Sequence, residues 1–278
     1  MAGVGYSDLS YVQFGCPTGA CLGGLGTMTV ITPETRAAFR EQGYVVVPNV
    51  LDRAAIEHGR SLVAGMLEQE SPPEGHVGVH FLWPGFGPAG HPLLDFYQAT
   101  GVGELAAELL RPGLGLEQPD FAQVATTVPP WPHRPGSPHL DGLTPLPDDG
   151  RPGTFSLLAG VWLTDQVGLH QGNLWVWPGT HLRSGQYLAE HGADVLTRVD
   201  ELDGGCPYPR VELGEPVQAR GEAGSVLFAH YLLAHNIGGH DGPAEMGRRE
   251  TIYYRLHAEN HRHRWREVVT DPLSEFRS

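Results

Sequence analysis

The sequence predicts a mainly β protein in which an N-terminal helical layer packs against a β-sandwich or jelly roll. The chain of 278 residues contains 38 glycines and 24 prolines, and so many turn-forming residues are typical of an all-β core with many short connections. From about residue 119, short runs rich in Val, Leu, Phe, Tyr and Trp alternate with Gly- and Pro-containing turns. This alternation indicates a series of short strands.

Helices are expected before this β region. In TPETRAAFREQG, residues 32–43, Thr32 is expected as the N-cap, followed by a proline in the first turn and a glycine at the stop. YVVVPNV, residues 44–50, follows as a strand. Asp52 is then expected to cap a second helix through RAAIEHGRSLVAGMLEQ, and residues 92–111 carry two more short helical patterns.

The strands of the core are expected in six segments. They are FAQVATTV, FSLLAGVWLTD, GNLWVWPG, EPVQARG, GSVLFAHYLLAH and ETIYYRLH. A helical insertion around SGQYLAEHGADVL interrupts them. No repeat of fixed period and no second-domain pattern is present. We therefore expect a Gly-rich tail over residues 1–31 and a single domain over residues 32–278, with the jelly-roll core at about 119–258.

Composition narrows the possible partners. Acidic residues exceed basic ones by 32 to 18, a formal charge of −14, which disfavours nucleic acid and anionic membranes as partners because both need a positive face. No stretch has the apolar length that crosses a bilayer, and no secretion signal is expected. The cysteines are three in number and lack a framework spacing. They indicate reduced thiols and a cytoplasmic protein. The oligomeric state cannot be read from the sequence.

A candidate metal site begins in GSPHLDGLTP, where His139 and Asp141 are separated by one residue. On a strand, side chains two residues apart share a face, so this pair could aim at one point. By itself such a pair is more typical of a hydrogen-bonded surface turn. His235 follows Asp141 by 94 residues, and a jelly roll can return a late strand beside an early one. Two histidines and one carboxylate form the facial triad that leaves three positions of an octahedral iron(II) ion open.

A candidate anchor for a carboxylate lies fourteen residues after His235. Arg249 begins the strand pattern of RRETIYYRL, and a guanidinium can bind a carboxylate through two parallel hydrogen bonds. Thr251 shares the strand face of Arg249, so its hydroxyl could assist. Arg248 is expected to point the other way, to solvent or to an ion pair.

These motifs together resemble the phytanoyl-CoA dioxygenase type of iron(II)/2-oxoglutarate dioxygenases. The segments that carry the resemblance run in family order from about residue 32 to 257. They are TPETRAAFREQGYVVVPNVLD, PHLDG, QGNLWVWPGTHLRSG, GSVLFAHYLLAHNIGG and RRETIYYRL. A lone His-x-Asp motif is weak evidence, but five ordered segments with consistent spacing are strong evidence.

The resemblance implies a double-stranded β-helix, the cupin-like jelly roll, with iron(II) bound by His139, Asp141 and His235. It further implies that Arg249 binds the distal carboxylate of the cosubstrate 2-oxoglutarate, and that Gln123 contributes a polar contact. The sequence departs from the family where a serine often follows the distal histidine, since Asn236 and Ile237 stand there, and at Gln171, where asparagine is common.

The implied reaction uses O2 and 2-oxoglutarate to hydroxylate an unactivated C–H bond of a small-molecule substrate, with release of succinate and CO2. Asp141 disfavours halogenation, since halogenating relatives have a small residue there. Desaturation, cyclisation and epimerisation stay open. A small metabolite or natural product is expected rather than an acyl-CoA, because the chain is so acidic. Two alternatives also remain, a catalytically inactive jelly-roll binding protein and a metal-dependent hydrolase that uses the same triad. The hydrolase would leave Arg249 without a task.

Other chemistry-bearing residues have structural interpretations. His230 competes with His235 as a ligand but is expected on the opposite face of one regular strand, either as a packing residue or as a residue that supports the metal ligands. His181, in PGTH, is expected in a turn. The histidines of HAENHRHRWRE, residues 257–267, are expected in a solvated C-terminal segment.

The segment directly before the His-x-Asp motif is the candidate substrate region. Trp131, His133 and Arg134 precede that motif, and we expect them at the pocket mouth. Arg134 could then receive an anionic group of the substrate.

Overall fold

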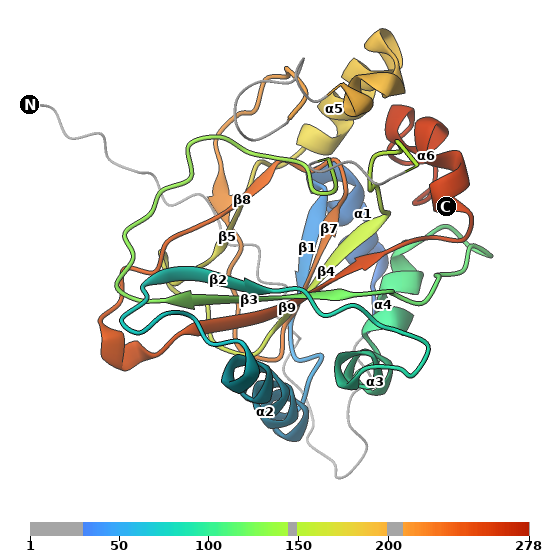
Figure 1. The fold of residues 1–278 in the computed structure, drawn as a ribbon. Helices are drawn as coiled ribbons and strands as arrows, with labels where there is room; N and C mark the ends of the chain where they lie inside the picture. Colours follow the sequence, from blue (N-terminus) through green and yellow to red (C-terminus); the bar gives the residue numbers. More distant parts are fainter. Residues whose placement is uncertain (1–29, 144–148, 199–207, 278) are drawn as a thin grey trace, which may run out of the picture.

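The computed structural model describes residues 30–143, 149–198 and 208–277 (Figure 1). The expected tail therefore lies almost wholly outside the described residues, as do Cys16, Cys21 and Cys206. The helices are α1 Pro33–Gln42, α2 Arg53–Gln69, α3 Pro92–Ala99, α4 Val102–Leu109, α5 Thr180–His191 and α6 His261–Thr270, with 3-10 turns η1 Ala193–Thr197 and η3 Ala244–Met246. The strands are β1 Tyr44–Val47, β2 Gly78–Leu82, β3 Ala122–Val128, β4 Leu157–Trp162, β5 Leu174–Val176, β6 Val217–Gln218, β7 Val226–His230, β8 His235–Ile237 and β9 Arg249–Leu256.

The described strands form two antiparallel sheets. The larger has six strands in the order β1-β7-β4-β9-β3-β2, and the smaller has three in the order β6-β5-β8. Neighbours in the large sheet are far apart in sequence, since β9 pairs with both β3 and β4. The mainly antiparallel, jelly-roll-like β prediction is confirmed at this level.

Each face of the large sheet packs against a different layer. Val124, Ile252 and Tyr254 share an apolar cluster with residues of α1 to α4, and in Figure 1 α2, α3 and α4 lie on one side of this sheet. The alternate residues of the same strands, such as Ala125 and Tyr253, belong to a second cluster with residues of β5 and α5. Because side chains alternate along a strand, residue parity decides whether a β9 side chain faces the helices or the space between the sheets.

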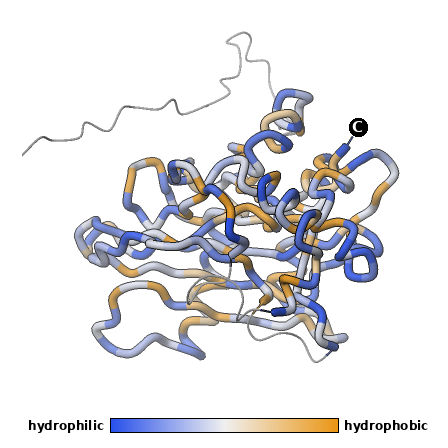
Figure 2. The backbone as a smooth tube through the Cα atoms, turned by 90° about the horizontal axis from the view of Figure 1, so that it is seen from above, coloured by the Kyte–Doolittle hydropathy of each residue, from blue (hydrophilic) through white to orange (hydrophobic). Residues whose placement is uncertain are grey.

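The N-terminal helices begin and end where the sequence predicts. The Thr32 hydroxyl accepts a hydrogen bond from the Thr35 amide at 3.2 Å, and the Asp52 carboxylate accepts one from the Ala55 amide at 2.8 Å. Each satisfies an amide that the first helical turn leaves without a partner. Gly43 ends α1 with φ of 83°, a left-handed conformation that costs glycine little. Along the backbone in Figure 2, hydrophobic and hydrophilic residues alternate over short distances, as in elements with one buried face.

The segment 224–235 differs from the prediction of one regular strand. β7 ends at His230, a tight turn follows in which the Leu233 amide donates to the His230 carbonyl at 2.9 Å, and β8 begins at His235. The two strands belong to different sheets. Every residue from Val226 to His235 is buried, so an unbroken apolar run cannot reveal where the chain changes sheets.

The predicted turn at His181 was wrong, and the predicted solvated segment at 257–267 was wrong for His257 and His261, whereas His263 is exposed. His181 is fully buried in the first turn of α5. His261 begins α6 and has 0% exposure, with Nδ1 at 3.1 Å from both Glu275 carboxylate oxygens and from the Ser156 hydroxyl. His257 is also buried and lies 3.1 Å from the Thr154 carbonyl. Hydrogen bonds between these polar groups allow them to be buried. The polar character of the segment does not by itself reveal such partners.

The strand β2 was not predicted, because Gly78–Leu82 has no clear apolar alternation. Among the helices that the structure describes, none has both the length and the apolar character needed to cross a membrane.

Candidate metal centre

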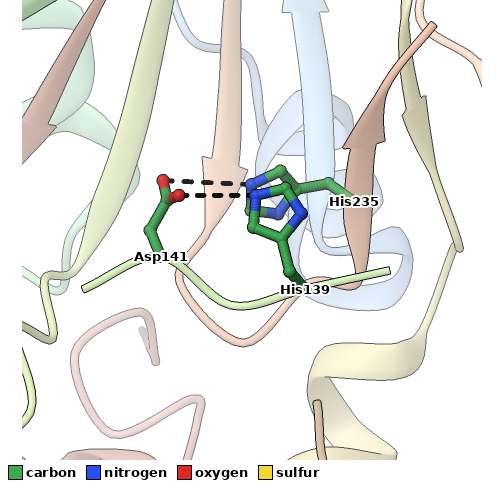
Figure 3. A group of neighbouring side chains, drawn as sticks. All are labelled: His139, Asp141 and His235. Carbon is green, nitrogen blue, oxygen red and sulfur yellow. Dashed lines mark ion pairs between the residues drawn. The ribbon is translucent and has the colours of Figure 1, made fainter. Parts of the chain in front are cut away.

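Backbone pairing brings the two halves of the candidate triad together. The His139 amide donates to the His235 carbonyl at 3.1 Å, and the two residues form an isolated antiparallel bridge. Leu140 between the two earlier candidates is 3% exposed and joins the apolar cluster between the sheets. Leu140 is anchored in that cluster, while His139 and Asp141 on either side of it project towards one another (Figure 3).

The three candidate ligand groups converge (Figure 3). One nitrogen or oxygen from each of His139, Asp141 and His235 can be chosen so that all lie within 4.8 Å of one another. His139 Nε2 is 3.5 Å from Asp141 Oδ1, and His235 Nε2 is 3.9 Å from Asp141 Oδ2. The ring centroids of the two histidines are 4.6 Å apart. Separations of this size suit three ligands that approach one ion.

The protonation states also fit a divalent metal. His235 Nδ1 donates to the Leu233 carbonyl at 2.9 Å, which leaves the Nε2 lone pair free. Burial, with help from His139, lowers the pKa of His235 to about 4, so this imidazole is neutral at neutral pH. Burial alone would raise the pKa of Asp141, but the His139 hydrogen bond and the charge of Arg255 hold it well below its usual value. Two histidines and one carboxylate are the donor set that non-haem iron(II) favours.

Arg255 is a neighbour of this site that the sequence reasoning missed. Its Nη2 lies 3.3 Å from Asp141 Oδ2. The sequence could have revealed this neighbour: Arg255 stands six residues after Arg249 on β9, and residues separated by an even number of positions on a strand share a face. Tyr231 also contacts the site through its hydroxyl, which donates to the Asp141 carbonyl at 3.3 Å.

Arg249 lies buried between the two sheets, with 1% exposure. Its Nε donates to Gln166 Oε1 at 3.3 Å and its Nη2 to the Tyr253 hydroxyl at 2.6 Å. Its Nη1 is buried and has no hydrogen-bond partner among the described residues. Arg248 projects the other way and pairs with Glu250 at 2.7 Å.

Two further polar atoms without partners lie on the strands that pair with β9. Thr127 on β3 is the direct cross-strand neighbour of Arg249, and Trp162 on β4 is the neighbour of Thr251. Thr127 Oγ1 and Trp162 Nε1 are both buried without a hydrogen-bond partner in the described part of the chain. Buried polar groups are normally satisfied. A cation and two partnerless polar groups on one inward face therefore fit a bound carboxylate.

The other predicted cosubstrate residues lie on this same inward face. Thr251 is fully buried, and its hydroxyl accepts from Gln166 Nε2 at 3.3 Å. Gln123 on β3 is the cross-strand neighbour of Tyr253 and so shares its face. Gln166 and Tyr253, which hold the Arg249 guanidinium, were not predicted. Tyr253 could have been found by its parity with Arg249.

The predicted substrate residues lie elsewhere. Trp131 pairs with His240 through two backbone hydrogen bonds, and its ring stacks on His133 with centroids 4.5 Å apart. Arg134 is exposed and forms a bidentate ion pair with Asp241. Their role in binding substrate stays a prediction.

A cavity of about 420 Å³ lies near Asp141, although none of the three candidate ligands is among its described lining residues. Gly142, which follows Asp141, and Arg255 both line it, together with Phe121, Thr154 and Arg262. Trp131, His133 and Arg134 are not among its described lining residues. A second cavity, of about 660 Å³, borders Arg249 at the other end of β9.

Solved structures of similar fold include two enzymes from nogalamycin biosynthesis. The alpha-ketoglutarate-dependent carbocyclase SnoK from nogalamycin biosynthesis is 22% identical with a TM-score of 0.53, over 84% of this chain and 87% of that chain. The epimerase SnoN from the same biosynthesis is 20% identical with a TM-score of 0.51, over 80% and 81%. HygX from Streptomyces hygroscopicus, solved with nickel and 2-oxoglutarate bound, is 15% identical with a TM-score of 0.51, over 82% and 87%. At these identities the likeness shows a shared fold.

A comparison of the sequence itself is more specific. No curated protein matches the chain. The sequence model of the phytanoyl-CoA dioxygenase (PhyH) family matches residues 39–245, a range that includes all three candidate ligands and ends just before Arg249. Because this match spans well over half of the chain, the protein belongs to the phytanoyl-CoA dioxygenase family.

Proposed function

We propose that this chain is a non-haem iron(II)- and 2-oxoglutarate-dependent oxygenase. It hydroxylates an unactivated C–H bond of a small metabolite or natural product and releases succinate and CO2. The two antiparallel sheets then form the double-stranded β-helix of the family. One observation carries the proposal: a converging His-Asp-His triad and a buried arginine with a partnerless nitrogen occur in one family member.

His139 Nε2, Asp141 and His235 Nε2 would hold the iron. Bound there, iron(II) with 2-oxoglutarate and dioxygen supplies the oxidant for the C–H bond. The Leu233 carbonyl keeps the His235 proton on Nδ1, so the other nitrogen would be free to bind the ion. The ionised state of Asp141 supplies the negative charge that a dication needs.

Arg249 would bind the distal carboxylate of 2-oxoglutarate. Gln166 and Tyr253 orient its guanidinium, and the partnerless Thr127 and Trp162 are hydrogen-bond donors that the carboxylate can satisfy. Thr251 and Gln123 complete the polar wall. Since Arg249, Thr127 and Trp162 are buried, water does not screen the ion pair.

The cavity beside Asp141 would receive the substrate. Gly142, which follows Asp141, and Arg255, which contacts Asp141, both line it. Its volume of about 420 Å³ falls in the range of small-molecule sites. SnoN, solved with Fe3+, alpha-ketoglutarate and nogalamycin RO, acts in natural-product biosynthesis, which supports the same substrate class here. Trp131, His133 and Arg134 remain proposed contacts for a part of the substrate that extends beyond this cavity.

The two alternatives lack an equivalent observation. A hydrolase that used the same triad would have no task for Arg249 and its partnerless neighbours. An inactive binding protein would not need to keep both the triad and the anchor.

An anaerobic titration tests the proposal. Apoprotein is mixed with iron(II) and 2-oxoglutarate, and the visible charge-transfer band of the 2-oxo acid chelate is recorded. We expect the band to saturate at one iron per chain and to be lost in His139→Ala. Admission of O2 should then convert 2-oxoglutarate to succinate, faster with a true substrate from a metabolite screen. A wild-type protein that gives neither the band nor succinate contradicts the proposal.

A further inference from the structure

The inward face of β9 ends in two arginines, of which the proposed function uses only one. Arg249, Thr251, Tyr253 and Arg255 alternate along the strand and so share a face. Arg249 stands at one end, and Arg255, six residues on, stands at the other, beside Asp141. Arg255 lines the cavity next to Asp141, but its side chain is only 16% exposed.

Aromatic rings hold the Arg255 side chain in place. Its guanidinium carbon lies 5.6, 5.3 and 5.6 Å from the ring centroids of Trp83, Phe121 and Phe155, distances at which a cation is attracted to a ring face. Its Nε is buried with no hydrogen-bond partner among the described residues. The aromatic neighbours restrict the side chain, so its contact with Asp141 is an oriented one.

Arg255 distinguishes the two oxygens of the Asp141 carboxylate. Oδ2 lies 3.3 Å from Arg255 Nη2 and 3.9 Å from His235, whereas Oδ1 is the oxygen 3.5 Å from His139. A carboxylate that is already held in one orientation needs no rearrangement when the metal binds. An oriented Asp141 should therefore bind a metal more tightly than one that rotates freely.

We propose that Arg255 is a positioning residue of the metal centre, which holds Asp141 Oδ2 so that the carboxylate is already oriented to present Oδ1 to the metal. This inference rests on the proposed function. Arg255 acts through Asp141, and its task is separate from that of Arg249, which binds the cosubstrate.

The test measures the affinity of apoprotein for iron(II) under anaerobic conditions, without and with 2-oxoglutarate. Arg255→Met keeps an unbranched apolar stem among the three rings and removes the charge and the donors. We expect at least tenfold weaker iron(II) binding, in line with the loss of other groups that orient metal ligands. Arg255→Lys keeps the charge and one donor and should recover part of the affinity.

Whether iron(II) affinity falls or rises in Arg255→Met distinguishes a positioning role from the simple loss of a positive charge. Removal of a cation close to a dication would by itself strengthen metal binding. Weaker binding by Arg255→Met therefore supports positioning, and equal or tighter binding overturns it. If Arg255→Met does not fold, Arg255→Lys decides, because its charge is unchanged: a loss of affinity supports the inference and wild-type affinity refutes it.

Arg262→Met is the matched control. Arg262 lines the same cavity and pairs with Asp120 at 2.7 Å, but it does not contact the triad, and its substitution should leave iron(II) affinity unchanged. Failure of the wild-type protein to bind iron(II) and 2-oxoglutarate would count against the proposed function itself. Normal wild-type binding with an unaffected Arg255→Met would remove only the role of Arg255.

Discussion

Replacement of Arg249 by methionine should weaken 2-oxoglutarate binding without weakening iron(II) binding. The guanidinium is 1% exposed, and one of its nitrogens lacks a partner in the described structure. A hydrogen bond to a charged group contributes about 1.5–3 kcal/mol, and loss of one partner also leaves the ligand carboxylate buried and uncompensated. We take about 3 kcal/mol, which corresponds to roughly a 150-fold increase in Kd.

The assay compares two ligands that differ only at the distal end. 2-Oxoglutarate and 2-oxopentanoate share the 2-oxo acid group, but a methyl group replaces the distal carboxylate in the second. The wild-type protein with iron(II) should prefer 2-oxoglutarate by about the same 150-fold, and Arg249→Met should lose most of this preference. Arg248→Met is the control, since Arg248 projects away from the site and pairs with Glu250.

The comparison separates ligand recognition from misfolding. A destabilised protein would bind both ligands poorly, whereas loss of the anchor weakens only the ligand with two carboxylates. The reasoning is refuted if folded Arg249→Met keeps the wild-type preference for 2-oxoglutarate.

Two further predictions concern packing and pH. A Cβ at Gly172, where φ is +79°, would stand 3.1 Å from the Arg249 side chain, so Gly172→Ala should lower both stability and 2-oxoglutarate affinity. In the control Gly90→Ala, φ is a similar +81° but the new Cβ would enter open space. This variant should lower only the free energy of unfolding, by about 1–2 kcal/mol in urea. Equal 2-oxoglutarate affinity of the two variants would contradict the proposed clash with Arg249. Burial lowers the pKa of His181 and of His257 to about 4. Below about pH 6.5 these histidines therefore become protonated in the unfolded state but stay neutral in the folded state. The free energy of unfolding should be at its full value above pH 6.5 and should fall towards pH 4 by up to about 1.4 kcal/mol per pH unit for each histidine. His181→Gln should make this pH dependence shallower. A urea midpoint that is constant from pH 7 to 5 would be inconsistent with neutral buried histidines.

The amino-acid sequence alone determined the features that depend on near neighbours. Thr32, Asp52 and Gly43 mark helix boundaries because capping acts within one turn. The alternation of β9 placed Arg249 and Thr251 on one face and Arg248 on the other, because side-chain direction has a period of two residues. The sequence also supplied the candidate ligands, which the structure brings together, while their role in metal binding stays a prediction.

Only the tertiary structure decided which distant residues meet. The run from Val226 to His235 divides between two sheets. Thr127 stands opposite Arg249, and Trp162 opposite Thr251, only because β3 and β4 both pair with β9. The contact between Arg255 and Asp141 joins residues 114 positions apart. Such contacts depend on strand order and register, which are set by the combined burial of many side chains across the chain and which no local pattern encodes.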